Sequence, residues 1–348
     1  MLVQSILLDN GAAKTSIQCR RYLGNKYRLL PFIDSVISQQ CEDVKSLADI
    51  FAGTGVVASL YPEKRIITND ILFCNYLCHV AWFGEENFSM GKILTLTEEF
   101  NRLEPDTDNY MSENFRNTYF NLSTCRKIGA IRENIEQQYQ SKRLNFREYA
   151  LLIASLLYGM DKIANTCGHY DAFRRGVELS GELEMKVLDV SEQRSNRGNR
   201  CYNEDANILV RNIQADLVYI DPPYNSRQYS DAYHVLENVA RWEKPEVFGV
   251  ARKMDRGFLK SRYCTRAATA AFRDLIEHIR ARYILVSYNN MAESGHGRSN
   301  AKISDTELLS ILLERGEVQV FSTDYKAFTT GKSNRPENEE RLFLVSVR

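Results

Sequence analysis

Residues 217–224 read LVYIDPPY, and this stretch decides the fold. Residues 217–220 are a brief apolar run rich in strand-preferring residues, and two prolines that cannot continue a ladder follow, so we predict a buried strand. Asp221 then stands at the carboxyl end of the strand, which in an open α/β sheet faces the ligand crevice. The prolines lack an N–H, so the turn offers mainly acceptors beside the ring of Tyr224. These groups suit a planar amine, although Asp and Pro also form ordinary turns.

A second stretch, residues 47–57 (LADIFAGTGVV), contains an apolar strand, a Gly-x-Gly turn and an apolar run that could start a helix. Gly53 and Gly55 permit a positive φ and close backbone approach, as a loop that cradles a nucleoside cofactor requires. The full dinucleotide-binding pattern is absent, because Ser59 stands at about the place of its last glycine. An NAD-binding interpretation is therefore weakened.

Residues 51–55 (FAGTG) followed by residues 221–224 (DPPY) resemble motifs I and IV of S-adenosylmethionine-dependent amino-methyltransferases that act on DNA. The order of cofactor loop, long middle segment and catalytic tetrapeptide is similar to that of the alpha group of N6-adenine DNA methyltransferases. That group includes Dam-like enzymes and enzymes of restriction-modification systems. Residues 21–26 (RYLGNK) resemble the group's first motif, although the group usually has two adjacent glycines where this chain has Gly24-Asn25.

Two further matches extend the resemblance. Residues 66–70 (IITND) form an apolar run ending in an acid, about 15 residues past the Gly-x-Gly turn. The resemblance implies that Asp70 holds the ribose hydroxyls of S-adenosylmethionine, and a helix N-cap is the alternative. Residues 202–206 (YNEDA) resemble the third motif, in which an acid contacts the adenine of the cofactor. Asp205 is the expected acid, and the adjacent Glu204 is the alternative.

The resemblance implies roles for the site residues. The cofactor pocket is assigned to Tyr22, Lys26, Phe51, Gly53, Gly55, Asp70, Asp205 and Asp221, and the catalytic turn to Asp221, Pro222 and Tyr224. Adenine N6 is a poor nucleophile, and the carboxylate of Asp221 with the carbonyl of Pro222 can accept its two hydrogens and aim its lone pair at the methyl donor. Because N6 lies inside a duplex, the base has to be flipped out, and Tyr224 could stack on it.

The chain carries 45 basic and 45 acidic residues, so a duplex-binding protein of this composition has to segregate its charges. Basic clusters stand at residues 194–200, 252–266 and 326–335, and each is equally compatible with a solvated surface. The polar, aromatic loop 165–175 resembles a segment near the DNA in these enzymes. As DNA contacts we predict Arg227, Tyr229, His169, Tyr170, Arg197 and Lys332.

We predict an α/β fold, with a Rossmann-like S-adenosylmethionine-dependent methyltransferase sheet, an antiparallel C-terminal hairpin and a helical target-recognition insert. The predicted divisions are an N-terminal tail (1–16), a catalytic domain (17–83 and 201–348) and the insert (84–200). Strands are expected at 46–51, 65–69, 217–220, 283–287, 317–321 and 341–347, and helices at 26–40, 90–103, 125–140, 146–164 and 305–315.

Composition supports a sizeable core, since 44% of the 348 residues are hydrophobic. We find no apolar run that could span a bilayer and no signal pattern, so we expect a cytoplasmic protein without a membrane partner. We also predict a monomer. The eight cysteines form no CxxC pair and are expected to be reduced. Cys74, Cys78 and His79 are the one candidate metal cluster, but no second ligand pair accompanies them, so no metal is expected.

The expected partners are double-stranded DNA and a cognate restriction endonuclease. Three alternatives stay open: methylation of cytosine N4 or of RNA adenine, a catalytically idle DNA-binding module, and a nucleotide-binding enzyme such as a dehydrogenase. C5-cytosine methylation needs an attacking thiolate, and no Pro-Cys motif is present to supply one.

Overall fold

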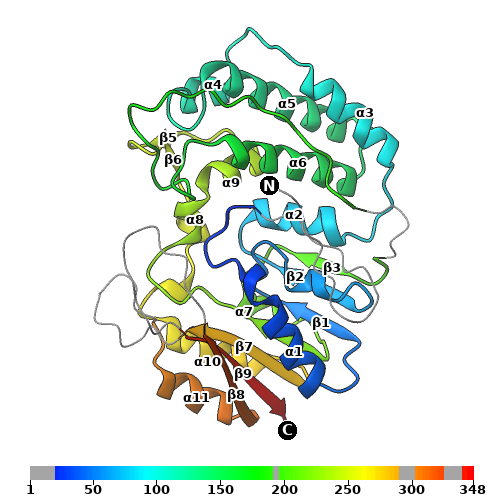
Figure 1. Ribbon diagram of the computed structural model, residues 1–348, viewed down its shortest axis with the longest axis vertical. Coiled ribbons are helices and arrows are strands. Elements are labelled where there is room, and N and C mark those ends of the chain that lie inside the picture. Colours follow the sequence, from blue (N-terminus) through cyan, green and yellow to red (C-terminus); the bar gives the residue numbers. More distant parts are fainter. Residues whose placement is uncertain (1–19, 191–195, 290–301, 325–338) are drawn as a thin grey trace.

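A seven-stranded sheet forms the centre of the computed structural model, with the order β3-β2-β1-β4-β7-β9-β8 (Figure 1). The structure describes residues 20–190, 196–289, 302–324 and 339–348. The strands are β1 (Ser46–Asp49), β2 (Arg65–Asn69), β3 (Arg200–Tyr202), β4 (Leu217–Ile220), β7 (Tyr283–Asn289), β8 (Gly316–Asp324) and β9 (Glu339–Val347). Pairing is parallel from β3 to β7, and β9 runs antiparallel to both β7 and β8. This topology confirms the predicted fold class and the C-terminal hairpin.

The parallel strands are buried on both faces, which explains why they read as continuous apolar runs. All four residues of β4 are buried, and its side chains alternate between two cores. Leu217 packs on one face of the sheet with α1 (Leu30–Gln40) and α2 (Phe73–Phe83). Val218 packs on the other face with α7 (Ala206–Leu209), α10 (Ala268–His278) and α11 (Asp305–Leu313). The strands therefore lie between two helical layers.

One expected helix differs. After Gly55 the chain forms only the short 3₁₀ helix η2 (Ala58–Leu60). Tyr61 ends it in a non-helical conformation, with φ −122° and ψ 62°. The cause is Pro62, because a proline disfavours helical geometry in the residue before it. Likewise, the predicted helix 26–40 begins as a 3₁₀ turn, η1 (Lys26–Leu29), and continues as α1.

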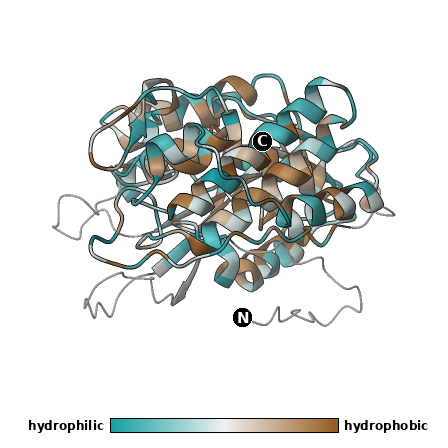
Figure 2. Cartoon of the chain, turned by 90° about the horizontal axis from the view of Figure 1, so that it is seen from above, coloured by the Kyte–Doolittle hydropathy of each residue, from teal (hydrophilic) through white to brown (hydrophobic). Residues whose placement is uncertain are grey.

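Helices from the predicted insert form the upper lobe in Figure 1: α3 (Met90–Asn101), α4 (Tyr110–Phe115), α5 (Leu122–Gln140) and α6 (Phe146–Ile163). Asn145 caps α6, and Glu148 completes a capping box with it. The core on the α1 and α2 side of the sheet continues into this lobe, where α6 packs on α2. Figure 2 shows the hydrophobic segments concentrated within the helical layers.

A later segment joins the same lobe, which the predicted domain boundaries did not include. It comprises α8 (Tyr229–Ala232), α9 (His234–Arg241) and the two-stranded hairpin of β5 (Val247–Phe248) and β6 (Lys253–Met254). The fully buried Arg132 of α5 donates to the carbonyl oxygens of Val239 (2.8 Å) and Ala240 (3.2 Å) at the end of α9. Trp242 Nε1 donates to Glu133 of α5 at 2.8 Å. Among the described helices, none has the length and apolar character needed to cross a bilayer.

Candidate active site

The carboxyl ends of the parallel strands open onto one cavity. Its lining comes from residues 22–26, 49–54, 56–57, 69–71, 204–206, 219, 221, 223, 228–230 and 258–263. The predicted residues Tyr22, Lys26, Phe51, Gly53, Asp70, Asp205 and Asp221 are all on this wall. Gly55, Pro222 and Tyr224 belong to the same turns, but their neighbours supply the lining. The structure thus brings the N-terminal motif, the glycine turn and the catalytic turn to one place.

Asp221 faces a buried lysine. Its Oδ1 lies 3.2 Å from Lys26 Nζ, and Nζ also lies 3.4 Å from Glu340 Oε2 of β9. Burial raises the pKa of Asp221 to about 6, while the charge of Lys26 opposes the rise. Burial alone would lower the pKa of Lys26, but Asp221 and Glu340 outweigh it and the pKa is raised well above its usual value. Lys26 is 5% exposed, so its charge is buried within the site.

Tyr224 packs next to this ion pair. Its ring packs edge-on against Tyr288, with centroids 5.9 Å apart, and Lys26 Nζ lies 5.9 Å from the Tyr224 centroid. The Tyr224 carbonyl accepts from the Lys302 N–H at 2.9 Å. The DPPY turn is therefore fixed by packing and by backbone hydrogen bonding.

Gly53 is clamped on both of its backbone groups. Its N–H donates to Asp70 Oδ2 at 2.9 Å, and its carbonyl oxygen accepts from Nε2 of the buried His79 at 2.9 Å. Its φ is +53°, and a Cβ here would lie 2.9 Å from the Tyr22 ring. A side chain is thus excluded by conformation and by space. Asp70 Oδ1 also accepts from the Leu72 N–H at 2.8 Å, and burial raises the pKa of Asp70 to about 7.

Helix α2 positions two parts of the pocket from one face. His79 holds the glycine turn, and Asn75, four residues earlier, donates from Nδ2 to the Tyr22 hydroxyl at 3.1 Å. Tyr22 also stacks on Tyr233, with centroids 4.7 Å apart and planes 9° apart. In the sequence, His79 was considered only with Cys74 and Cys78 as a metal cluster. Within the described part of the chain, no group of three His, Cys, Asp or Glu side chains is arranged to hold a metal ion.

Asp49 is a pocket residue that the sequence analysis missed. It ends β1, is 1% exposed and lines the cavity. Its Oδ1 has no hydrogen-bond partner among the described residues. Burial raises the pKa of Asp49 well above its usual value, and the nearby Asp221 and Asp70 add to the rise. A buried, unpaired carboxylate oxygen favours a cationic ligand group. Its place at the end of a predicted strand was the available signal.

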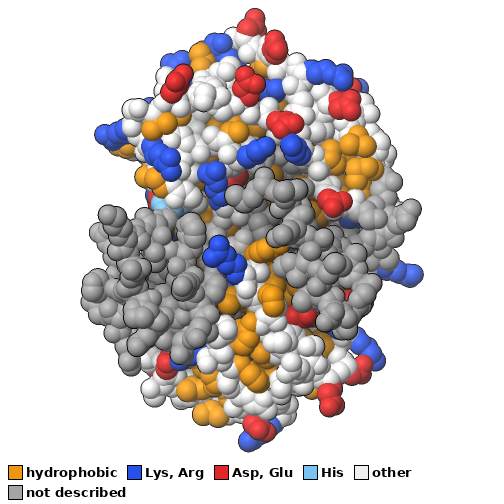
Figure 3. All heavy atoms as spheres, in the orientation of Figure 1, with side chains coloured by type: hydrophobic (Ala, Val, Ile, Leu, Met, Phe, Trp, Pro, Cys, Tyr) orange, Lys and Arg blue, Asp and Glu red, His pale blue; other side chains and the backbone are white. Residues whose placement is uncertain are grey.

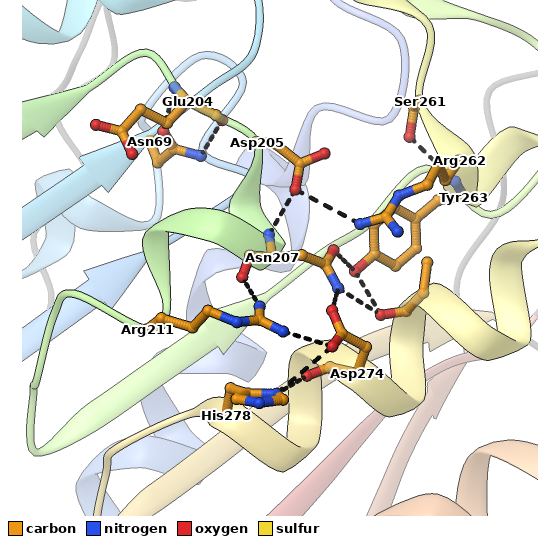
Figure 4. Close-up of polar contacts among 11 residues, drawn as sticks. Asn69, Glu204, Asp205, Asn207, Arg211, Ser261, Arg262, Tyr263, Asp274 and His278 are labelled. Carbon is orange, nitrogen blue, oxygen red and sulfur yellow. Dashed lines mark hydrogen bonds and ion pairs between the residues drawn. The ribbon is translucent and has the colours of Figure 1, made fainter.

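The far end of the pocket contains the third predicted motif (Figure 4). Asp205 caps α7 by accepting from the Asn207 N–H at 2.8 Å, and its Oδ1 lies 3.7 Å from Arg262 Nη2. The Asn69 side chain bonds both backbone groups of Glu204, each at 3.0 Å. Both candidate acids therefore line the cavity on backbone that is held in place.

Of two aromatic residues predicted to contact DNA, Tyr170 lies in the interior and Tyr229 is partly buried at the cavity wall. Tyr170 is 1% exposed, and its hydroxyl donates to Asp161 at 3.3 Å. Tyr229 donates to the Leu23 carbonyl oxygen at 3.2 Å, packs on Tyr22 with centroids 5.4 Å apart and lines the cavity. The buried position corrects the placement of Tyr170 at a DNA-facing surface, whereas the role of Tyr229 stays a prediction.

The other predicted DNA contacts differ in exposure. His169 is partly buried, and burial lowers its pKa. Arg227 and Arg197 are exposed. Lys332 lies outside the described residues.

This architecture, with a glycine turn, a buried acid and a DPPY turn around one cavity, is that of an amino-methyltransferase. The chain belongs to the family described as D12 class N6 adenine-specific DNA methyltransferase, whose model matches residues 22–292. Membership confirms the resemblance found in the sequence.

Curated relatives include the modification methylase StsI of Streptococcus sanguinis, 34% identical over 93% of this chain and 51% of the relative. The type II methyltransferase M.FokI of Planomicrobium okeanokoites is 29% identical over 93% of this chain and 52% of its own. The type II methyltransferase M.NlaIII of Neisseria lactamica is 29% identical over 91% of this chain and 94% of its own. The chain thus spans about half the length of StsI and M.FokI.

Proposed function

We propose that this chain transfers a methyl group from S-adenosylmethionine to N6 of a flipped adenine in double-stranded DNA, as the modification enzyme of a restriction-modification system. The observation that carries the proposal is the position of Asp221, which shares one cavity with the glycine turn and lies 3.2 Å from a buried lysine. Family membership supports adenine as the target base.

The pocket fits the proposed donor. S-adenosylmethionine, when bound, supplies an electrophilic methyl group on a sulfonium centre. The unpaired Oδ1 of Asp49 suits the cationic amino-acid end of that molecule. Gly53 lines the cavity, and the Tyr22 ring fills the space that a Cβ there would need, so the turn has to be glycine. Asp70 would hold the ribose hydroxyls, and Asp205 would accept from the adenine amino group.

Asp221 and Pro222 would act on the target base. An Asp221 carboxylate oxygen and the Pro222 carbonyl oxygen would accept the two N6 hydrogens and orient the nitrogen for in-line transfer. As positive charge develops on nitrogen, the nearby carboxylate stabilises it. Lys26 favours the ionised form of Asp221 against burial, which is the form that can accept. Tyr224 would stack on the extruded base.

The test is a methylation assay with radiolabelled S-adenosylmethionine on duplex DNA and on RNA, followed by base analysis. We expect label on N6-methyladenine in DNA alone, and loss of labelling in Asp221→Ala. Single-molecule sequencing of DNA from cells expressing the chain would give the modified base and its context together. Label on cytosine or RNA, or none in any nucleic acid, would overturn the proposal.

A further inference from the structure

The tip of the β5–β6 hairpin presents two large apolar side chains to solvent. Phe248 is 55% exposed and Val250 is 64% exposed. Gly249 stands between them with φ +70°, so the turn depends on a residue without a side chain. Scattered apolar residues are normal on a surface, but two at the tip of one projecting hairpin form a shape that can insert into a partner.

Contacts with neighbouring elements fix the base of this hairpin and keep its tip exposed. Val247 and Met254, which pair across the hairpin, are buried. The hydroxyl of Tyr119 lies 3.0 Å from the Ala251 carbonyl oxygen. Lys253 Nζ lies 2.5 Å from Asp171 of loop 165–175.

A second set of contacts fixes the base to α8. Lys253 Nζ lies 3.3 Å from Asp231 of that helix. Arg256 forms an ion pair with the same carboxylate and donates to the Met254 carbonyl oxygen at 3.0 Å. The hairpin is thus attached both to loop 165–175 and to the helix that follows the catalytic turn.

The tip itself carries basic residues. Residues 247–254 contain two cations and no acid, and the exposed acids Glu246 and Asp255 flank them. The acids of the supporting elements, Asp171 and Asp231, are already paired with Lys253 and Arg256. Three exposed arginines form no ion pair with any described acid: Arg174, Arg175 and Arg252. In Figure 3, basic and acidic side chains are both spread over the helical lobe.

The hairpin continues directly into the wall of the active site. After β6 the chain runs through residues 258–263, which line the cavity. Gln228, four residues past the catalytic turn, is joined to this wall through its amide. It accepts from the Ser261 N–H at 2.8 Å and donates to the Ser261 carbonyl oxygen at 3.2 Å. A partner bound at the tip would therefore lie against the arm that forms one side of the pocket.

We propose that the β5–β6 hairpin docks on the duplex beside the extruded adenine, with Phe248 and Val250 packed against bases and the three arginines on phosphates. The inference rests on the proposed function, since it requires duplex DNA as substrate. Apolar wedges stabilise locally unstacked DNA, which base flipping produces. Arginine contacts with phosphate supply affinity that depends on salt.

The test compares two double variants, Phe248→Ser with Val250→Ser, and Leu313→Ser with Val320→Ser. The second pair is also exposed, at 58% and 50%, but lies on α11 and β8. Each protein is titrated with a duplex carrying the modified sequence and 2-aminopurine at the target position. We expect the hairpin variant to bind about tenfold or more weakly and to lose the fluorescence increase, while the control matches wild type. Binding of labelled S-adenosylmethionine should be unchanged in both.

Two outcomes would overturn the hairpin proposal. One is wild-type DNA binding and flipping by the hairpin variant. The other is a wild-type dimer that dissociates in the hairpin variant during sedimentation, because the tip would then bind a second copy of the chain. In either case methylation of duplex DNA by wild type would leave the proposed function standing, whereas its absence would remove that function itself.

Discussion

The pocket and the hairpin tip hold their side chains in opposite ways. In the pocket, both backbone groups of Gly53 are bonded to buried side chains, and Asp221 lies against a buried lysine. At the tip, Phe248 and Val250 are exposed on the same hairpin as the exposed Arg252. The first region is organised before any ligand binds. The tip leaves apolar side chains exposed, and a bound partner would cover them.

The difference has a physical consequence for how each region responds to change. Charges in a buried site interact strongly and are little screened by salt, whereas exposed charges are screened within about 10 Å at ordinary ionic strength. Changes in the pocket should therefore alter cofactor binding and turnover at any salt concentration. Changes at the tip should alter DNA binding in a manner that depends on salt.

The largest effect is expected for Asp221→Ala. Turnover should fall about a thousandfold or more, the order of loss seen when one preorganised charge-stabilising group is removed. Labelled S-adenosylmethionine should still bind, because the glycine turn and Asp49 are untouched. Single-turnover kinetics and equilibrium dialysis would measure both quantities. Full turnover in this variant would refute the assigned role.

The next effect concerns His79→Leu, which removes the donor to Gly53. We expect the dissociation constant for S-adenosylmethionine to rise on the order of tens of fold, since an unpaired buried acceptor costs about 1–3 kcal/mol. His79→Gln, which retains a donor at similar reach, should recover most of the affinity, and DNA affinity should stay constant. Ser155→Ala, a buried change in α6, is the matched control. Equal loss in His79→Leu and His79→Gln would show that the bond to Gly53 does not matter.

The pH dependence of kcat/KM should follow Asp221, whose pKa is raised to about 6 by burial. The carboxylate is the active form, so the rate should fall about tenfold per unit below that pH. In Lys26→Met the fall should begin at higher pH, because nothing then opposes burial.

The pH dependence of folding stability runs opposite to that of the rate. A raised pKa means that protonation favours the folded state, so the contribution of Asp221 is fully present below its ordinary pKa of 3.8 and is lost as the pH rises through about 6. Denaturation of wild type and Asp221→Asn across this pH range would measure this contribution to stability.

A profile of kcat/KM that is flat between pH 5 and 8 would contradict the assignment of Asp221 as the acceptor.

The smallest effect is expected for Arg262→Ala at the rim of the pocket. Its pair with Asp205 is 3.7 Å long, and the two side chains are 51% and 42% exposed. Solvent screens such a pair, so affinity for S-adenosylmethionine should change about twofold or less. Asp205→Ala should cost more, since it removes the proposed contact itself. Isothermal titration at two salt concentrations would measure the affinity of both variants for S-adenosylmethionine. A large loss of affinity in Arg262→Ala would show that Arg262 contributes to the pocket as strongly as the buried residues do.

The strands that carry the site could be predicted because their signals are local. Residues 217–220 form an apolar run stopped by prolines, and β4 has the same bounds. Gly53 was expected at a close approach, and the Tyr22 ring fills the space that a side chain would need. Instead of the helix expected after Gly55 the chain forms a 3₁₀ turn, because Pro62 disfavours helical geometry in the residue before it.

By itself, the sequence determined the parallel strands, the order of the motifs and the side chains at the strand ends, because short apolar runs and their stop residues act over a few positions. Tertiary structure alone decided that Glu340 would reach Lys26 across 314 positions, and that Tyr170 would be buried. It also decided that the β5–β6 hairpin would pack against the helical lobe. These outcomes depend on packing between distant segments, which no local pattern of residues encodes.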